Sequence, residues 1–190
     1  MSRFDPIRTH LESGDLVILP TETVFGLATR ADNKAAVDKI YKAKGRAFNK
    51  PLALCVKDIE WAERYAIFDS VSRSIAAQHW PGSVTLVLNA KADTGLDTRL
   101  HSNDGEITIG LRCPNVFWRE EMTLPLALTS ANKSGEPDCT ELDAAIANLS
   151  EYTDAALAAD AVLSGAPSTV VRIKDGKLTV LRQGVVKVDL

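Results

Sequence analysis

The chain has 190 residues, 45% of them hydrophobic and 25% charged, and a formal net charge of −3 at pH 7. This composition predicts one soluble globular domain over residues 1–190, and it excludes both disorder and a general nucleic-acid-binding surface, which usually carries a basic balance. No apolar run approaches the ~20 residues that cross a bilayer, and residues 1–6 lack the apolar core of a secretory signal. We therefore expect a cytoplasmic protein without a membrane partner.

Helix and strand patterns alternate along the first part of the chain. Asp5-Pro6 marks the start of a first helix, and Gly14 marks its end. Residues 16–19 form a continuous apolar run, which is typical of a strand buried on both faces. Asn33 can cap a second helix. The apolar side chains on one face of that helix are Ala36, Val37, Ile40 and Tyr41.

A basic segment follows the second helix. Residues 39–57 (KIYKAKGRAFNKPLALCVK) contain six cations and no acidic residue, although the whole chain is acidic. The middle of this segment, residues 44–52, leads into a strand predicted at residues 52–56, and a loop there can direct several cations at one point. The segment therefore predicts a polyphosphate site.

Polar clusters follow two of the predicted strands, at the position where open α/β sheets bind ligands. Thr21, Glu22 and Thr23 come directly after the first strand, and residues 129–135 (TSANKSG) follow a short strand at residues 126–128. The threonine hydroxyls could hold a small polar substrate, which Gly26 would let the backbone approach closely. Both clusters also suit ordinary turns or a helix cap, so the pattern alone leaves both interpretations open.

The middle of the chain predicts helices from Asp58 and at residues 71–80, then a strand at residues 84–90. Residues 92–104 form a polar loop of a length that often covers a site. Residues 107–112 alternate like a strand, and the residues on one face are Thr108, Gly110 and Arg112. Arg112 is then either a salt-bridged surface residue or an anion clamp.

The end of the chain predicts one helix and several strands. Residues 140–143 (TELD) resemble a capping box, opening a helix with Leu142, Ala145, Ile146 and Leu149 inward. Residues 161–163 predict a short strand, and residues 168–173 and 178–182 predict a hairpin with Asp175-Gly176 at its tip. The distant cysteines Cys55, Cys113 and Cys139 include no C-x-x-C pair, so we expect reduced, structural thiols.

The polar positions supply cations, hydroxyls and an amide, but no pair of general acid and base. None of the three histidines falls in a polar cluster, so a Ser-His-Asp or Cys-His hydrolase is not indicated. The sequence also lacks the motifs G-x-x-x-x-G-K-[ST] and G-x-G-x-x-G. The remaining set suits phosphoryl or nucleotidyl transfer, in which cations and a metal ion stabilise charge on phosphate oxygens.

Seven motifs occur in order along the chain: PTETVFGLA (20–28), KGRAFNKPL (44–52), WPGSVTLVL (80–88), GLRCP (110–114), TSANKSGEP (129–137), STVV (168–171) and LRQG (181–184). Together they resemble the YrdC-like family of threonylcarbamoyl-AMP synthases. The resemblance implies an α/β fold with a twisted mixed sheet and flanking helices around a large open cleft. The chain departs from the family at Phe25, where many members have Tyr, and at Cys55, where longer members carry His.

The resemblance also implies a nucleotidyltransferase activity, in which L-threonine, bicarbonate and ATP give threonylcarbamoyl-AMP and pyrophosphate, with Mg2+ as cofactor. The product would feed threonylcarbamoyladenosine modification of tRNA through separate transfer proteins. Two alternatives stay open. One is a paralogue with a different small substrate, and the other is an RNA-binding or ribosome-maturation module that holds tRNA or double-stranded RNA on the basic segment.

Site residues follow from the matching motif positions. The family's K-x-R and S-x-N signature falls on Lys44, Arg46, Ser130 and Asn132, and the implied catalytic cations are Lys44, Arg46 and Lys50. The implied ATP contacts are Arg46, Lys50, Thr108, Asn132, Thr140 and Arg182. The implied threonine contacts are Thr23, Arg112, Ser130 and Ser168, with Arg112 as a bidentate clamp for the carboxylate. Because a carbamate intermediate reverts in water, residues 92–104 are a candidate lid.

Overall fold

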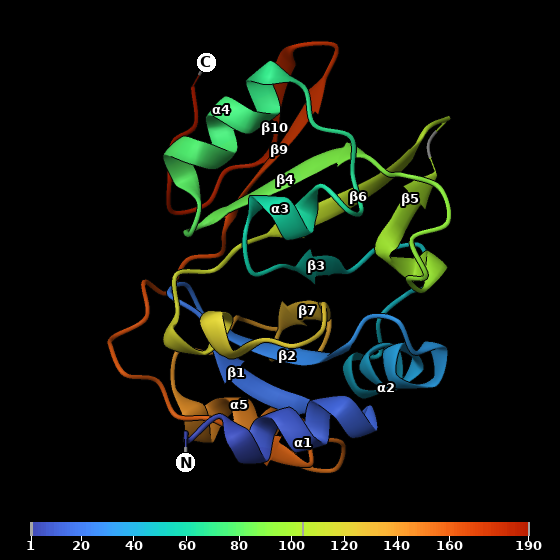
Figure 1. Cartoon of the computed structure of the whole chain (residues 1–190). Coiled ribbons are helices and arrows are strands. Elements are labelled where there is room, and N and C mark those ends of the chain that lie inside the picture. Colours follow the sequence, from blue (N-terminus) through green and yellow to red (C-terminus); the bar gives the residue numbers. More distant parts are fainter. Residues whose placement is uncertain (1, 104, 190) are drawn as a thin grey trace.

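The computed structural model describes residues 2–103 and 105–189 and has a mixed α/β fold (Figure 1). Ten strands in these residues form one twisted sheet in the order β10-β9-β4-β6-β3-β7-β2-β1-β8, with β5 paired to β6. The strands are β1 Val17–Pro20, β2 Phe25–Arg30, β3 Ala53–Cys55, β4 Val84–Asn89, β5 His101–Asn103, β6 Ile107–Arg112, β7 Leu126–Ser130, β8 Ala155–Ala156, β9 Thr169–Lys174 and β10 Lys177–Arg182. The helices are α1 Asp5–Ser13, α2 Lys34–Lys44, α3 Ile59–Ala62, α4 Ser70–His79 and α5 Leu142–Leu149, with 3-10 turns η1 Thr98–Leu100 and η2 Phe117–Glu121.

Helices pack against both faces of the sheet, and this explains the continuous apolar runs. In β1, Ile18 belongs to one buried apolar cluster, whereas Val17 and Leu19 belong to a second. The second cluster includes apolar residues of α1 and Trp118 of η2, whose indole N–H donates to the carbonyl of Pro20. In Figure 1, α3 and α4 lie over the half of the sheet that contains β9, β4 and β6, and α1 lies beside β1. The predicted strand buried on both faces is confirmed.

The N-terminal helices end as their sequences predict, but α1 begins one residue early, since Phe4 and not Asp5 is its N-cap. α1 ends at Gly14, and α2 ends at Gly45, both in the left-handed conformation that favours glycine. The side chain of Asn33 accepts a hydrogen bond from the backbone N–H of Ala36, which confirms the predicted cap. The end of α2 therefore delivers Lys44 and the basic loop to the middle of the sheet.

The C-terminal hairpin and the cysteines also agree with the predictions. β9 and β10 pair through a turn at Asp175-Gly176, where both residues have positive φ. The three cysteines are free and buried. No helix in the part of the chain that the structure describes is long and apolar enough to span a bilayer.

Several local predictions were wrong because tertiary pairing decided the outcome. The polar turn after β1 leads into an unpredicted strand, β2, which pairs with β1 from Pro20 opposite Phe25. Residues 161–163 are not a strand; Val162 is exposed, and the outer edge of β1 is paired instead with β8. The predicted capping box is also absent, since α5 begins after Glu141 without a side-chain cap hydrogen bond.

Candidate active site

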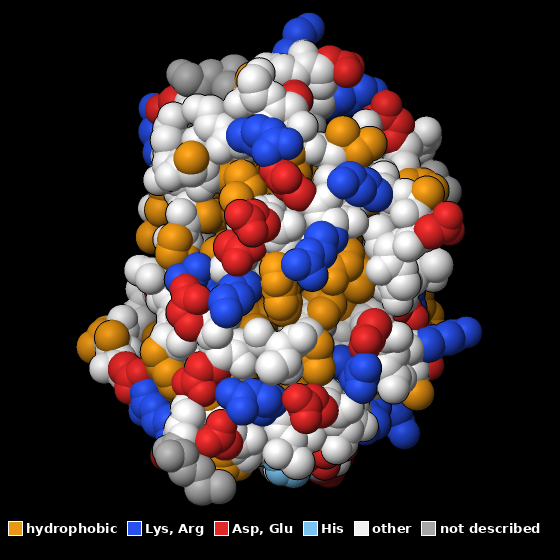
Figure 2. Space-filling view, in the orientation of Figure 1, with side chains coloured by type: hydrophobic (Ala, Val, Ile, Leu, Met, Phe, Trp, Pro, Cys, Tyr) orange, Lys and Arg blue, Asp and Glu red, His pale blue; other side chains and the backbone are white. Residues whose placement is uncertain are grey.

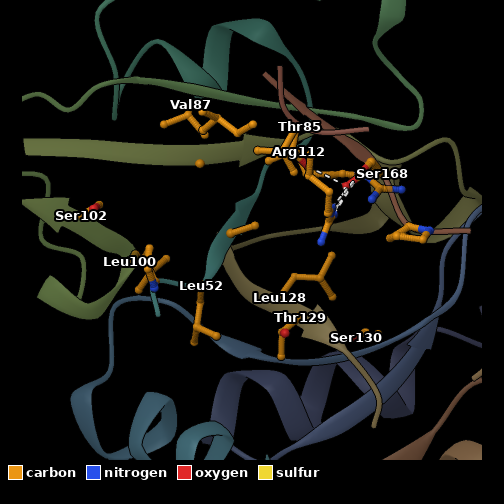
Figure 3. A pocket seen from close by; sticks show the side chains of 18 of the residues that line it. Leu52, Thr85, Val87, Leu100, Ser102, Arg112, Leu128, Thr129, Ser130 and Ser168 are labelled. Carbon is orange, nitrogen blue, oxygen red and sulfur yellow. Dashed lines mark hydrogen bonds between the residues drawn. The ribbon is translucent and has the colours of Figure 1, made fainter. Parts of the chain in front are cut away.

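A cavity of about 700 Å³ lies between the strands β4 and β6 on one side and β2 and β7 on the other (Figure 3). On β6, its lining residues are Thr108, Gly110 and Arg112, whereas Ile109 and Leu111 are fully buried in the core. The predicted alternation of this strand is therefore confirmed. The expected open cleft corresponds to this cavity.

The wall of the cavity is apolar in one region and polar in another. Figure 3 places Leu52, Leu100 and Leu128 along the apolar part. Arg112 points into the space near Ser168, from the opposite side. The cavity can therefore accept a ligand that combines an apolar surface with charged groups.

The polar turn between β1 and β2 is braced by Thr21. Its hydroxyl oxygen accepts hydrogen bonds from the backbone N–H groups of Thr23 and Val24, at 3.2 and 3.1 Å, and lies 2.8 Å from the hydroxyl of Thr23. Thr21 and Thr23 are both buried and both line the cavity. The structural interpretation of this turn is thus confirmed. Binding of a substrate by these hydroxyls remains a prediction, for which Thr23 lies at the cavity wall.

Arg112 enters the cavity from the end of β6 and is held from behind by Glu22. Its Nη2 donates to Glu22 Oε1 at 2.8 Å and to Thr23 Oγ1 at 3.0 Å. The side chain of Arg112 is only 8% exposed, and its Nε is buried without a hydrogen-bond partner among the described residues. Arg112 is therefore salt-bridged, as one interpretation of the sequence held, and it also lines the cavity; its role as an anion clamp remains a prediction.

Arg182 reaches the same wall from the end of β10. Its Nη2 donates to the backbone carbonyl and the hydroxyl of Ser168, at 2.9 and 3.2 Å. The hydroxyl of Ser168 lies 2.9 Å from that of Thr85. The pKa of Arg182 is lowered, mainly by burial; the charge of Asp138 opposes this effect, and the charge of Arg112 adds to it. The guanidinium groups of Arg182 and Arg112 are therefore close enough to interact.

Arg46 lines the cavity from the basic loop. Its Nε and Nη2 donate to the backbone carbonyls of Lys50 and Pro51, both at 3.0 Å. The loop is also held by Tyr41, whose hydroxyl donates to the carbonyl of Lys50 at 2.9 Å. Lys50 itself is exposed and is not among the described residues that line the cavity.

Lys44 is buried behind the cavity wall. Its Nζ donates to the backbone carbonyls of Ser130 and Asn132 and, at 3.2 Å, to Asn132 Oδ1. Burial, and then the charge of Arg46, lower the pKa of Lys44 to about 8. Lys44 therefore braces the turn that carries Ser130 and Asn132 instead of lining the cavity.

The other cations of the basic segment do not converge on one surface. Lys39 Nζ donates to the carbonyl of Gly14 and lies 3.4 Å from Asp15, whereas Lys57 Nζ lies 3.7 Å from Glu120. Each of these lysines is therefore partly neutralised at a different place. The contiguous charge in the sequence becomes several separate contacts in the fold.

The cavity brings together seven of the predicted site residues and leaves four away from its wall. The seven that line it are Thr23, Arg46, Thr108, Arg112, Ser130, Ser168 and Arg182. The four that do not, within the described residues, are Lys44, Lys50, Asn132 and Thr140. Asn132 is nevertheless linked to the wall, since its Oδ1 accepts from the hydroxyl of Ser130.

Sequence reasoning did not single out Glu22, Thr85 or Asp138. Glu22 lies between two threonines directly after a buried strand, and that position was its available signal. Thr85 and Asp138 lie within or beside motifs, but only the fold brings them to the cavity. Whether such residues reach the cavity depends on contacts between segments that are distant in sequence.

The candidate lid is partly a fixed wall. Within residues 92–103, Leu100 is fully buried and lines the cavity, and Arg99 pairs with Asp97 and Asp38. The backbone N–H of Leu52 also donates to the carbonyl of Arg99. The last residue of the predicted loop, Asp104, lies outside the described residues. The η1 and β5 portion is therefore tied to the body of the protein.

The two departures from the family pattern lie in the core. Phe25 and Cys55 are buried, and neither is among the described residues that line the cavity. Burial raises the pKa of the Cys55 thiol, which keeps it protonated. Neither side chain is therefore placed to contact a ligand in this cavity.

Comparison with known proteins identifies relatives of this chain. The sequence pattern of the Sua5, YciO and YrdC family, described as "Telomere recombination", matches residues 9–184. A putative threonylcarbamoyl-AMP synthase of Methanocaldococcus jannaschii is 32% identical over 184 residues, covering 96% of this chain and 86% of the relative. The threonylcarbamoyl-AMP synthase of Bacillus subtilis is 34% identical over 182 residues, covering 89% of this chain and 52% of the relative.

A solved structure shares the fold. The crystal structure of P. abyssi Sua5 complexed with L-threonine has a TM-score of 0.85 and 28% identity, covering 94% of this chain and 53% of that chain. The chain thus spans most of the M. jannaschii relative but about half the length of the B. subtilis and P. abyssi proteins. The chain belongs to the Sua5, YciO and YrdC family.

Proposed function

We propose that the protein is a threonylcarbamoyl-AMP synthase, a nucleotidyltransferase that makes L-threonylcarbamoyladenylate and pyrophosphate from L-threonine, bicarbonate and ATP. The observation that carries the proposal is that Arg46, Arg112 and Arg182 line one cavity. Arg112 is paired with a carboxylate, whereas Arg46 and Arg182 donate only to neutral oxygens among the described residues. The relatives named above as threonylcarbamoyl-AMP synthases support the assignment.

The amino acid would bind at the Arg112 end. A guanidinium presents its N–H groups in a planar fork that matches a carboxylate. The side chain of Arg112 points into the cavity, and Thr23 and Ser168 line the same wall. The P. abyssi Sua5 structure contains L-threonine, which supports an amino acid as the ligand of this fold.

The triphosphate would bind between Arg46 and Arg182, which keep unneutralised charges at the cavity. Positioned cations stabilise the charge that develops on phosphate oxygens during transfer. Thr108 and Ser130 line the same space. The hydroxyl of Thr108 can donate a hydrogen bond to a ligand, while that of Ser130 donates to Asn132 and can accept one. Lys44 contributes by holding the Ser130–Asn132 turn, while a direct role for Lys50 remains a prediction.

The chemistry needs position and charge, with no covalent intermediate on the protein. The threonine amine attacks the carbon derived from bicarbonate, water is lost, and a carbamate forms. A carbamate oxygen then attacks the α-phosphorus of ATP, and the bond to pyrophosphate breaks. The apolar wall formed by Leu52, Leu100 and Leu128 would limit water at the labile carbamate.

Mg2+ would enter with the nucleotide. It usually binds one or two protein carboxylates together with substrate phosphates and water. The described residues contain no group of three or more His, Cys, Asp or Glu that could hold a metal by itself. Asp138 lines the cavity near Arg182 and would be the carboxylate that faces the ion. The ion would neutralise part of the charge on the phosphates.

A reaction with purified protein tests the proposal. ATP, L-threonine and labelled bicarbonate should yield pyrophosphate and a labelled adenylate, and omission of any one substrate should abolish both products. If ATP is not consumed in a threonine-dependent and bicarbonate-dependent manner, the proposed activity is wrong. L-serine, L-valine and L-allothreonine in place of threonine would reveal a paralogue with a different small substrate.

The same protein can be tested for RNA binding. The basic segment offers little contiguous charge for RNA, because Lys44 is buried and Lys39 and Lys57 lie near acidic residues. We therefore expect weak binding of tRNA and double-stranded RNA at physiological salt. Tight, steeply salt-dependent binding without adenylate formation would favour the RNA-binding alternative.

A further inference from the structure

We propose that Glu22 is a specificity-determining residue that directs phosphate away from the amino-acid end of the cavity. Glu22 holds the guanidinium of Arg112 in place and cancels its charge, so that this end favours a zwitterionic amino acid over a phosphate. The identity of the amino acid rests on the proposed function. The charge arrangement itself rests only on contacts within this chain.

Three separate segments hold the carboxylate of Glu22. Oε1 accepts from Arg112 Nη2 at 2.8 Å and from the hydroxyl of Ser83 at 3.0 Å. Oε2 accepts from the backbone N–H of Asn115 at 3.2 Å. Because Thr21 also braces the turn that carries Glu22, the carboxylate has little freedom to move. A fixed carboxylate in turn fixes the plane of the guanidinium.

The contacts to Arg112 leave one part of its fork for a ligand. Nη2 donates to both Glu22 and Thr23, and Nε is shielded inside the protein, whereas no hydrogen bond occupies Nη1 among the described residues. Arg112 lines the cavity, and Figure 3 shows its side chain pointing into the open space. An acceptor supplied by a ligand at Nη1 would complete the hydrogen bonding of the guanidinium.

Charge distinguishes Arg112 from Arg46 and Arg182, whereas Arg172, which also lines the cavity, is paired with Glu106. Arg112 and Glu22 together carry no net charge, with side chains 8% and 21% exposed. Arg46 and Arg182 donate to backbone carbonyls and to Ser168, and within the described residues neither pairs with a carboxylate. A multiply charged phosphate gains most near Arg46 and Arg182, because Glu22 would repel it at Arg112.

The charge of Glu22 would keep a polyphosphate from occupying the amino-acid end of the cavity. Arg112 and Arg182 are close enough for Arg112 to lower the pKa of Arg182, so a polyphosphate could bridge them and block the amino acid. The carboxylate of Glu22 places a negative charge on one side of such a bridge. The two substrates are thus directed to different arginines by charge as well as by shape.

Glu22→Gln tests the idea, because it removes the charge but keeps the size and one acceptor oxygen. We expect the Kd for L-threonine, measured by calorimetry, to rise about tenfold, and inorganic phosphate to become competitive with threonine. For the wild-type protein, phosphate should leave the Kd for threonine unchanged. Direct titration with inorganic phosphate should reveal one additional site in Glu22→Gln, which Glu22→Gln combined with Arg112→Met loses again.

Glu106→Gln is the matched control. Glu106 lines the same cavity and pairs with an arginine, Arg172, at 2.9 Å, but it has no contact with Arg112 among the described residues. Glu106→Gln should not create phosphate competition against threonine. The melting temperatures of both variants should stay close to that of the wild-type protein, which separates a charge effect from a loss of fold.

The outcomes separate this inference from the proposed function. If the wild-type protein does not bind threonine, the proposed substrate is wrong, yet the additional phosphate site in Glu22→Gln still decides the role of Glu22. If Glu22→Gln gains no phosphate site that depends on Arg112, the inference is wrong. It is also wrong if Glu106→Gln produces the same phosphate competition, since the effect would then reflect only the net charge of the cavity.

Discussion

The Nζ of Lys44 donates to the backbone carbonyl of Asn132, which lies 88 positions further along the chain. The same amine also donates to the carbonyl of Ser130, and the backbone N–H of Ser134 donates back to the carbonyl of Lys44. These bonds join the end of α2 to the turn after β7. The lysine of the K-x-R pair and the S-x-N turn are therefore one structural unit.

Lys44 should make stability depend on pH in a predictable direction. Its pKa is lowered to about 8 by burial and by Arg46, while an unfolded lysine titrates near 10.4. Between these values the unfolded chain binds more protons, so the free energy of unfolding should rise with pH. The contribution of Lys44 should gain about 2 kcal/mol from about pH 7.5 to about pH 9.5.

Urea denaturation of wild type and Lys44→Met at both pH values measures this effect as a difference, in which the other titrating groups cancel. Lys42→Met, on the exposed side of the same helix, is the control and should behave like wild type. If the difference in free energy of unfolding between wild type and Lys44→Met is the same at both pH values, Lys44 is not a buried amine with a lowered pKa.

Arg46→Ala should lose activity while the fold is retained. The guanidinium lines the cavity and, among the described residues, donates to two carbonyls of its own loop, so its removal disturbs little packing. Loss of a preorganised charge at a transferring phosphate typically costs a factor of about 10² to 10³ in rate. Threonine-dependent pyrophosphate release measures the loss, and Lys133→Ala, an exposed cation beside the S-x-N turn, provides the control.

Lys50→Ala should have a much smaller effect than Arg46→Ala. Lys50 is exposed and its side chain is away from the cavity wall, and exposed charges usually contribute no more than about 1 kcal/mol. We therefore expect at most about a fivefold fall in kcat/KM in the same assay. A loss as large as that of Arg46→Ala would mean that the loop moves to bring Lys50 to the nucleotide.

Two glycine substitutions should distinguish an effect on stability from an effect on ligand binding. A Cβ at Gly184 would lie 2.1 Å from the carbonyl oxygen of Pro167, whereas a Cβ at Gly110 would meet nothing closer than Thr85 Cγ2 at 3.6 Å. Gly184→Ala should cost about 3 kcal/mol or more of stability by overpacking against backbone. Gly110→Ala should keep the stability but reduce ligand binding, because it adds a methyl group to the cavity wall.

Thermal denaturation and threonine calorimetry on the two proteins would check this pair. Equal melting temperatures would show that the backbone around Gly184 can relax, contrary to our expectation. Unchanged threonine and ATP affinities in Gly110→Ala would place the ligands away from the middle of β6.

Removal of Mg2+ should affect the nucleotide and leave the amino acid unaffected. The described residues include no cluster that could hold the metal alone, so we expect it to arrive on the triphosphate. EDTA should therefore abolish pyrophosphate release, and added Mg2+ should restore it. Calorimetric threonine binding should be the same with and without EDTA, and a metal-dependent threonine affinity would contradict this arrangement.

Much of the fold could be predicted from local patterns because those patterns act over a few residues. The Asn33 cap, the glycines that end α1 and α2, and the Asp175-Gly176 turn all function within one turn of chain. β2 and β8 could not be predicted in the same way. Whether a short segment becomes a strand depends on which edge of the sheet is free to pair with it, and that is a long-range property.

The basic segment shows the same limit for the site. Its sequence by itself determined the presence of a cluster of cations after a helix and, through its motifs, the resemblance to the family. Only the tertiary structure decided what each cation does: Arg46 lines the cavity, Lys44 is buried as a brace and Lys50 remains exposed. It also placed Glu22 behind Arg112, 90 positions away, because the turn between β1 and β2 meets the end of β6 only in the folded protein.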